Sequence, residues 1–170
     1  SNKNTKIAYY SPKWISRRLD DVIDSTVESI GCFCVDPVSN FTRSRILTPK
    51  TLIKSILSAG HSLSGEISDY FTSSETDIPS VSAVSQRRDL LYPEIFKSIN
   101  RRFLSFIDNL STLNGYYILA QDGSDINLPF LQDDTQISYG QDSVVCQYHM
   151  NALYDCINHV FWKSRIDLPT

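Results

Sequence analysis

Residues 116–129 read YYILAQDGSDINLP, an apolar and β-prone run that leads into two acids around a Gly-Ser pair. We predict one strand over residues 116–120, a turn at Gly123-Ser124 and a second strand over residues 126–130, where apolar and polar residues alternate. A strand that ends in a carboxylate is a common way to build a metal site, because the strand fixes the acid while the turn leaves its oxygens open. The alternative is a plain hairpin, since Asp-Gly and Gly-Ser form turns whatever the function.

The chain after this stretch has the pattern of further strands. Residues 131–142 are polar and loop-like, and apolar residues then alternate with polar ones over residues 144–155 and 156–166. We predict two strands there, joined near residues 157–159. A three-stranded meander leaves an open edge and an uncovered face. We therefore expect the chain to be a fragment or to pair with another chain.

The first 110 residues have helical periodicity instead. Residues 1–12 are polar and predict a flexible arm, while apolar residues over 14–30 recur at three-and-four spacing until Gly31. Four further helices are expected, each from its own start signal. These signals are Thr48-Pro49, Ser62 (with Gly60 ending the helix before it), Ser80 and Pro93, and the last helix continues to Leu110. Helices followed by strands indicate an α+β fold.

The helix that starts at Ser80 is polar on one side and ends in arginines. That side holds Ser82, Ser85, Gln86 and Arg87. Three short helices with a polar third one are typical of a helix-turn-helix, in which the third helix enters the major groove and Arg or Gln pairs with base edges. The alternative is a plain helical bundle, which has the same periodicity.

Charge is distributed unevenly along the chain, although the net charge is only −3. Residues 1–110 contain fourteen Lys and Arg against twelve Asp and Glu, and residues 111–170 contain two against seven. A mildly basic front and an acidic back fit a DNA-contacting region followed by a metal-holding one. The alternative is ordinary solvated helix faces.

Composition favours a folded protein in a reducing compartment. With 41% hydrophobic and 11% aromatic residues the chain can bury a core. The spacing of Cys32, Cys34, Cys146 and Cys156 suits neither a zinc knuckle nor a redox pair, so we expect small buried thiols in a reduced cytosol. The sequence has neither a long apolar run nor a secretion signal, and we predict no membrane association.

Four motifs resemble those of a known family. Residues 41–48, FTRSRILT, are similar to its F-x-R-x-R-x-L motif, and residues 79–88, PSVSAVSQRR, to its PS-x-SA-x-x-QR-R helix. Residues 120–129, AQDGSDINLP, match its A-x-DGSD-x-N-x-P strand, and residues 149–155, HMNALYD, match its H-x-NALYD strand. The family is that of the DDE transposases of the insertion-sequence-four type. The resemblance covers about residues 41–160.

The resemblance implies a domain organisation and a chemistry. Residues 1–40 would be an arm and a helix, residues 41–112 a helical DNA-binding domain, and residues 113–170 the first strands of a truncated ribonuclease-H-like catalytic domain. By its place in the motif, Asp122 would be a catalytic carboxylate and a Mg²⁺ ligand. The family holds two ions with three carboxylates to cleave DNA and transfer the strand. The second Asp and the Glu belong beyond these strands, so we expect the chain alone to be inactive.

The expected partner is double-stranded DNA at transposon ends, in the bacterial cytoplasm at the nucleoid. The residues expected to contact DNA are Arg43, Arg45, Lys50, Lys54, Gln86, Arg87 and Arg88. Those expected to be structural, or to support a metal ligand, are Asp125, His149 and Asp155. Two alternatives stay open. One is an inactive DNA-binding or regulatory module derived from a transposase, and the other is a remnant whose sheet edge pairs with a partner or forms a homodimer.

Overall fold

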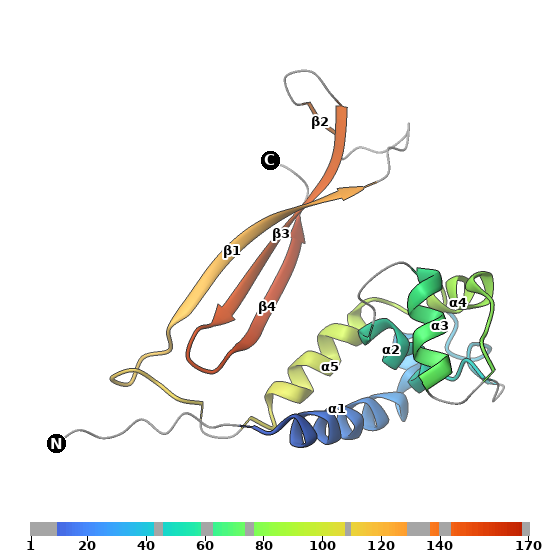
Figure 1. Cartoon of the computed structure of the whole chain (residues 1–170), viewed down its shortest axis with the longest axis horizontal. Coiled ribbons are helices and arrows are strands. Elements are labelled where there is room, and N and C mark those ends of the chain that lie inside the picture. Colours follow the sequence, from blue (N-terminus) through green and yellow to red (C-terminus); the bar gives the residue numbers. More distant parts are fainter. Residues whose placement is uncertain are drawn as a thin grey trace. The chain divides into compact units, whose positions relative to one another are not determined.

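The structure is a computed structural model of the whole chain (Figure 1). It describes residues 10–42, 46–58, 63–73, 77–107, 110–128, 137–139 and 144–167. These residues divide into a helical unit within 10–107 and a sheet unit within 108–170. The helical unit includes the first helix, for which the sequence predicts a separate region, residues 1–40. The predicted α+β fold class is confirmed.

The first helix, α1, spans Pro12–Val27. The Ser11 side chain accepts a hydrogen bond from the Trp14 N–H (3.2 Å), and Pro12 occupies the first turn, where its missing N–H costs nothing. Ser11-Pro12 therefore begins a helix, and the expected arm does not extend to residue 12. The helix also ends earlier than predicted. Gly31 lies in a short 3-10 helix, η1, that spans Ile30–Phe33.

The other four helices follow the predicted start signals. They are α2 (Pro49–Leu57), α3 (Leu63–Ser73), α4 (Val81–Arg88) and α5 (Glu94–Leu104). Thr48 and Ser80 are confirmed as N-caps, since their hydroxyls accept the N–H groups of Thr51 and Ala83 at 3.2 Å each. The predicted signals Gly60 and Ser62 lie outside the described residues. The last helix ends at Leu104, so its expected continuation to Leu110 is wrong.

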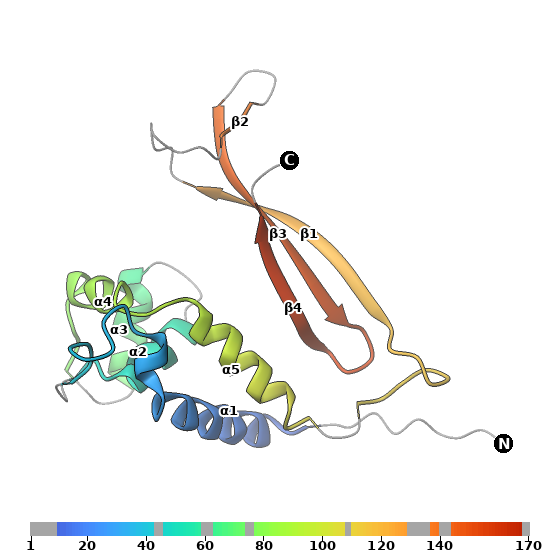
Figure 2. The same ribbon diagram turned by 180° about the vertical axis from the view of Figure 1, so that it is seen from behind.

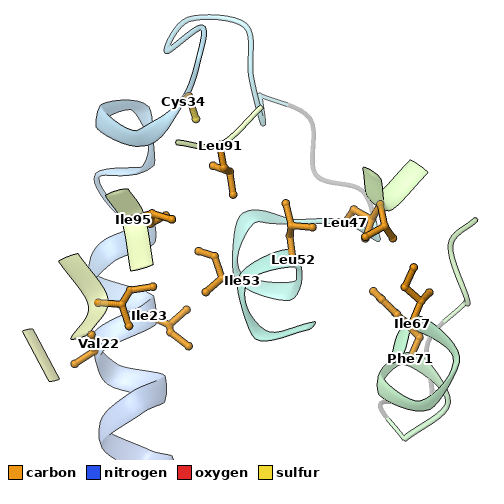
Figure 3. Packing of buried hydrophobic residues seen from close by; sticks show 12 residues of the cluster. Val22, Ile23, Cys34, Leu47, Leu52, Ile53, Ile67, Phe71, Leu91 and Ile95 are labelled. Carbon is orange, nitrogen blue, oxygen red and sulfur yellow. The ribbon is translucent and has the colours of Figure 1, made fainter. Parts of the chain in front are cut away.

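One apolar core holds the helical unit together. Figure 3 shows Ile23 of α1, Ile53 of α2 and Ile95 of α5 pointing toward one another, and all three are fully buried. Phe71 of α3 and Val84 of α4 extend the same cluster. Burying a side chain of this size stabilises a fold by about 1.5–3 kcal/mol. The three-and-four spacing read from the sequence thus marks the inward faces of the helices at these positions, whereas Ile15 of α1 and Leu57 of α2, which follow the same spacing, are exposed.

The cysteines divide between core and surface. Cys34 and Cys146 are buried, as predicted. Cys32 and Cys156 are exposed, so the prediction of four buried thiols is wrong for these two. Burial, together with the nearby charge of Asp36, raises the pKa of the Cys34 thiol. None of these four cysteines forms a disulfide.

The sheet unit is a four-stranded antiparallel sheet. Its strands are β1 (Leu119–Leu128), β2 (Ile137–Tyr139), β3 (Val144–Asp155) and β4 (Val160–Asp167). The central strand is β3, which pairs with β1 along one edge and with β2 and β4 along the other (Figures 1 and 2). The two predicted C-terminal strands are confirmed, and β2 is a short strand inside the segment expected to be a loop.

The predicted turn at Gly123-Ser124 is wrong. Residues 119–128 form one uninterrupted strand, in register with β3 from Leu119 opposite Asp155 to Leu128 opposite Cys146. Ten consecutive pairings satisfy the backbone more fully than a local turn would, so tertiary pairing overrides the turn propensity of Asp-Gly. The tight turn occurs instead at residues 156–159, close to its predicted place between the last two strands.

Candidate functional site

Asp122 occupies the middle of β1, directly opposite Ala152 of β3. Its side chain is exposed, and one carboxylate oxygen accepts a hydrogen bond from the backbone N–H of Gly123 (2.9 Å). The residue is therefore held by a strand and not, as predicted, at a strand end beside a turn. A strand fixes the Cα–Cβ direction of an acid more firmly than a turn does.

Asp125 lies on the opposite face of the sheet from Asp122, because successive side chains of a strand alternate between faces. It is paired in register with His149, and Asp125 Oδ1 is 2.8 Å from His149 Nδ1. The two acids of the DGSD motif consequently do not converge on one site. Asp125 serves as the partner that orients the His149 ring.

Gly123 makes room for that ring. A Cβ atom at this position would lie 2.8 Å from both Cε1 and Nε2 of His149 and 3.5 Å from the Asn151 side-chain oxygen. The imidazole therefore lies against the bare backbone of β1, on the same face as Asp125. The sequence suggests a glycine chosen for a turn, whereas the structure requires it for a close cross-strand approach.

Asp155 is a fully buried acid at the end of β3, with an exposed fraction of 0%. Its carboxylate accepts hydrogen bonds from the backbone N–H groups of Ile157 (3.0 Å) and Asn158 (2.9 Å), from the Asn158 amide (2.9 Å) and from the Trp162 indole (3.2 Å). Burial by itself would raise the pKa of Asp155, but these hydrogen bonds outweigh it and lower the pKa below its ordinary value. This geometry fits the predicted structural role.

Asn158 is a residue that the sequence reasoning missed. Its side chain accepts a hydrogen bond from the Ser111 N–H (2.7 Å) and donates one to the Ser111 carbonyl (3.0 Å), so it ties the segment before β1 to the β3–β4 turn. An Asn in the turn is visible in the sequence, but its partner is 47 positions away. Local patterns carry no signal for such a contact.

The carboxylates of the sheet unit do not by themselves fit a two-ion centre. Asp125 is hydrogen-bonded to His149, and Asp155 is hydrogen-bonded to the β3–β4 turn. Among the described residues, Asp122 has one hydrogen bond, from the N–H of the next residue, Gly123. Among the described residues no group of three or more His, Cys, Asp or Glu is arranged to hold a metal ion. Two ions need several shared carboxylates.

In the helical unit, α4 presents its polar residues to solvent. Ser82, Ser85, Gln86 and Arg88 are exposed, and Val84 anchors the opposite side in the core. The Gln86 amide donates to the Ser82 hydroxyl at 3.3 Å. The structure therefore exposes both predicted residues, but it does not place them on one face: Gln86 lies beside Ser82, whereas Arg88 lies one turn after the buried Val84.

Arg87 faces differently from Arg88. Its guanidinium carbon lies 5.2 Å from the centroid of the Phe41 ring, and the side chain is half-buried. This is a cation–π distance, so Arg87 contributes to packing between α4 and the segment before α2. The predicted contacts Arg43 and Arg45 lie outside the described residues.

Lys50 and Lys54 join two helices. The ammonium of Lys50 is 2.6 Å from Asp24, and that of Lys54 is 2.7 Å from Asp20, so α2 is clamped to α1 by two ion pairs. The hydrogen bond to Asp20 raises the pKa of Lys54 above its ordinary value, against the opposing effect of burial. Both lysines, predicted to contact DNA, thus have carboxylate partners on α1.

Within the described residues no helix is long and apolar enough to cross a membrane. Comparison of the chain with family models, with curated proteins and with solved structures gives no match.

Proposed function

We propose that this chain is the DNA-binding region, with the opening strands of a ribonuclease-H-like catalytic domain, of a DDE transposase of the insertion-sequence-four type. The observation that carries the proposal is the exposed surface of α4, on which Ser82, Ser85, Gln86 and Arg88 are all open to solvent. Gln and Arg are the side chains that pair bidentately with adenine and guanine in the major groove. Serine hydroxyls are suited to the flanking phosphates.

In this proposal α4 is the recognition helix of a helix-turn-helix-like unit. The core residues Leu52 of α2, Phe71 of α3 and Val84 of α4 belong to one buried cluster, which supports α4 from behind while its polar face stays open. A recognition helix needs this support, because base contacts demand a fixed helix position in the groove. Double-stranded DNA at transposon ends, at the bacterial nucleoid, is the proposed partner.

The sheet unit supplies Asp122 to the catalytic part of the proposal. Its exposed carboxylate on a central position of β1 supports a role as one Mg²⁺ ligand. When bound, Mg²⁺ would activate an attacking oxygen for strand cleavage and transfer. The remaining carboxylates are proposed to come from outside these strands, so the chain alone is expected to bind DNA without cutting it.

A second candidate is an inactive DNA-binding or regulatory module derived from such a transposase. The contacts of Asp125 and Asp155 favour it, because both acids are committed to holding the sheet together. This candidate has the same proposed DNA interface on α4. It differs from the first because no metal centre forms and DNA is not cleaved.

The test is binding of the full chain to duplex DNA over a range of salt concentrations. We expect affinity to fall steeply with salt, as phosphate contacts require. Arg88→Ala should weaken binding by about 1–3 kcal/mol if Arg88 reads a base, or lower the salt slope by about one if it contacts phosphate. Lys97→Ala is the matched control, since Lys97 is also an exposed cation and lies on another helix, α5. Equal losses in both variants, or no duplex binding at low salt, would reject the α4 interface.

A further inference from the structure

The sheet unit concentrates its positive charge on one strand. Residues 111–170 contain two cations, Lys163 and Arg165, and both lie on β4. They pair in register with Leu153 and Asn151, which are two residues apart on β3, so both cations belong to one face of the sheet. Both are exposed, and the Arg165 side chain keeps 72% of its surface open although its Nε donates to Asp167.

Two aromatic rings lie on the same face. The Trp162 indole donates to Asp155, which follows Leu153 by two residues and therefore shares its face. Tyr117 packs against the indole with a ring-centroid distance of 5.4 Å and an interplanar angle of 60°. Despite these contacts Tyr117 and Trp162 are 47% and 37% exposed. Their rings are fixed in place and still open to solvent.

The local backbone explains this placement. The β3–β4 register shifts between Leu153 and Tyr154, so β4 contains one extra residue opposite that point. Such a bulge re-aims side chains. Trp162 is the residue between the paired Phe161 and Lys163, and its indole is turned toward the buried Asp155 carboxylate. The ring is thus pre-organised before any ligand arrives, which lowers the entropy cost of binding.

We propose that Tyr117, Trp162, Lys163 and Arg165 form an aromatic–basic patch that binds single-stranded nucleic acid. Bases stack on the exposed rings, and the backbone phosphates contact the two cations. A duplex keeps its base faces inside the helix and cannot use the rings. The seven acids of residues 111–170 repel a broad polyanion, whereas a single strand can follow the narrow cationic β4. The patch lies on the face of the sheet opposite Asp122. It belongs to a different unit from α4, and its proposed ligand differs from the duplex proposed for α4.

The experiment measures binding of the full chain to a fluorescein-labelled oligothymidylate of about 12 nucleotides, a length within the usual site size. Tyr117→Ala should weaken binding about tenfold, because one stacked base contributes about 1–3 kcal/mol. The pair Lys163→Ala/Arg165→Ala should also weaken binding and make it less sensitive to salt, because two phosphate contacts are lost. Tyr117→Phe should retain the affinity of the natural chain. Arg88→Ala should weaken duplex binding alone, which keeps failure of this proposal distinguishable from failure of the α4 interface.

A second measurement reads the patch directly. The chain has two tryptophans, Trp14 and Trp162, so Trp14→Phe leaves Trp162 as the single indole reporter. Oligothymidylate should quench its fluorescence, and an abasic oligomer of equal charge should quench it far less. Unchanged affinity in a folded Tyr117→Ala variant would overturn the proposal. A second result would also overturn the proposal: the chain self-associates through Tyr117, and the oligonucleotide does not change the fluorescence of Trp162.

Discussion

At the scale of single residues, Gly123 and Asp155 show how the sheet unit uses side-chain space and charge. Gly123 leaves room for the His149 ring, which Asp125 holds by its Nδ1. Asp155 accepts three hydrogen bonds from the β3–β4 turn and a fourth from Trp162 on β4. The sequence suggests a turn former at Gly123, which the structure corrects, whereas the buried hydrogen bonds of Asp155 fit the structural role expected for it.

Gly123→Ala tests the close approach of the His149 ring. The added methyl meets Cε1 and Nε2 at 2.8 Å, so the ring must move away from Asp125, and we expect a loss of about 1 kcal/mol of unfolding free energy. In a His149→Ala background the same change should be neutral or stabilising, because alanine loses less backbone entropy than glycine. Urea unfolding followed through Trp162 in a Trp14→Phe chain measures both values. The same sign in both backgrounds would contradict the prediction.

The lowered pKa of Asp155 predicts that the sheet unit loses stability in acid. Its pKa is lower in the folded chain than in the unfolded one, so its stabilising contribution is present above the unfolded pKa of about 3.9 and is lost as pH falls through the folded value. Asp155→Asn should flatten this part of the pH dependence. Asp155→Ala should cost about 3 kcal/mol at neutral pH, because two backbone N–H groups lose their acceptor. Urea midpoints at pH 7 and near pH 3 are the measurement, and parallel profiles for the natural chain and the Asn variant would refute it.

At the scale of elements, α1 and α2 are joined by charge as well as by core packing. Lys50 forms an ion pair with Asp24, and Lys54 forms one with Asp20. The same two helices bury Ile23 and Ile53 in the core. The lysines therefore have a role between helices that a count of basic residues cannot show. Pairs this exposed contribute little individually and are screened by salt.

Exchange of charge across this contact tests the ion pairs. Lys54→Ala should lower the stability of the helical unit by less than about 1 kcal/mol at low salt, with little effect at high salt. Lys54→Asp should cost more, and Asp20→Lys in the same chain should recover most of the loss. Thermal unfolding by circular dichroism gives the values. If the double exchange shows no recovery, the pair does not hold the two helices together.

At the scale of the whole molecule, the chain divides its work between two units. The helical unit has a common apolar core and an exposed polar helix, while the sheet unit places Asp122 on one face and the aromatic–basic patch on the other. This division supports separate duplex and single-strand contacts, which the two binding experiments measure independently.

The sequence alone determines the elements that depend on local chemistry. The caps Thr48 and Ser80, the helical periodicity around Ile23, Ile53 and Ile95, and the turn at residues 156–159 are all predicted by short-range patterns, because caps and periodicity act within a few residues. The α+β class follows from the order of these elements. The polar side of α4 is readable in part: Ser82, Ser85 and Gln86 are exposed as predicted, whereas Arg87, predicted on the same side, is half-buried against Phe41.

Tertiary structure alone decides what depends on distant partners. Continuous pairing with β3 makes residues 119–128 one strand, although DGS is a strong turn signal. The same pairing separates Asp122 from Asp125, places His149 over Gly123 and gathers Trp162, Lys163 and Tyr117 on one face. Strand register sets which side chains share a face, and a shift of one residue would exchange the faces. Register is fixed by contacts across the sheet, so local sequence patterns cannot specify it.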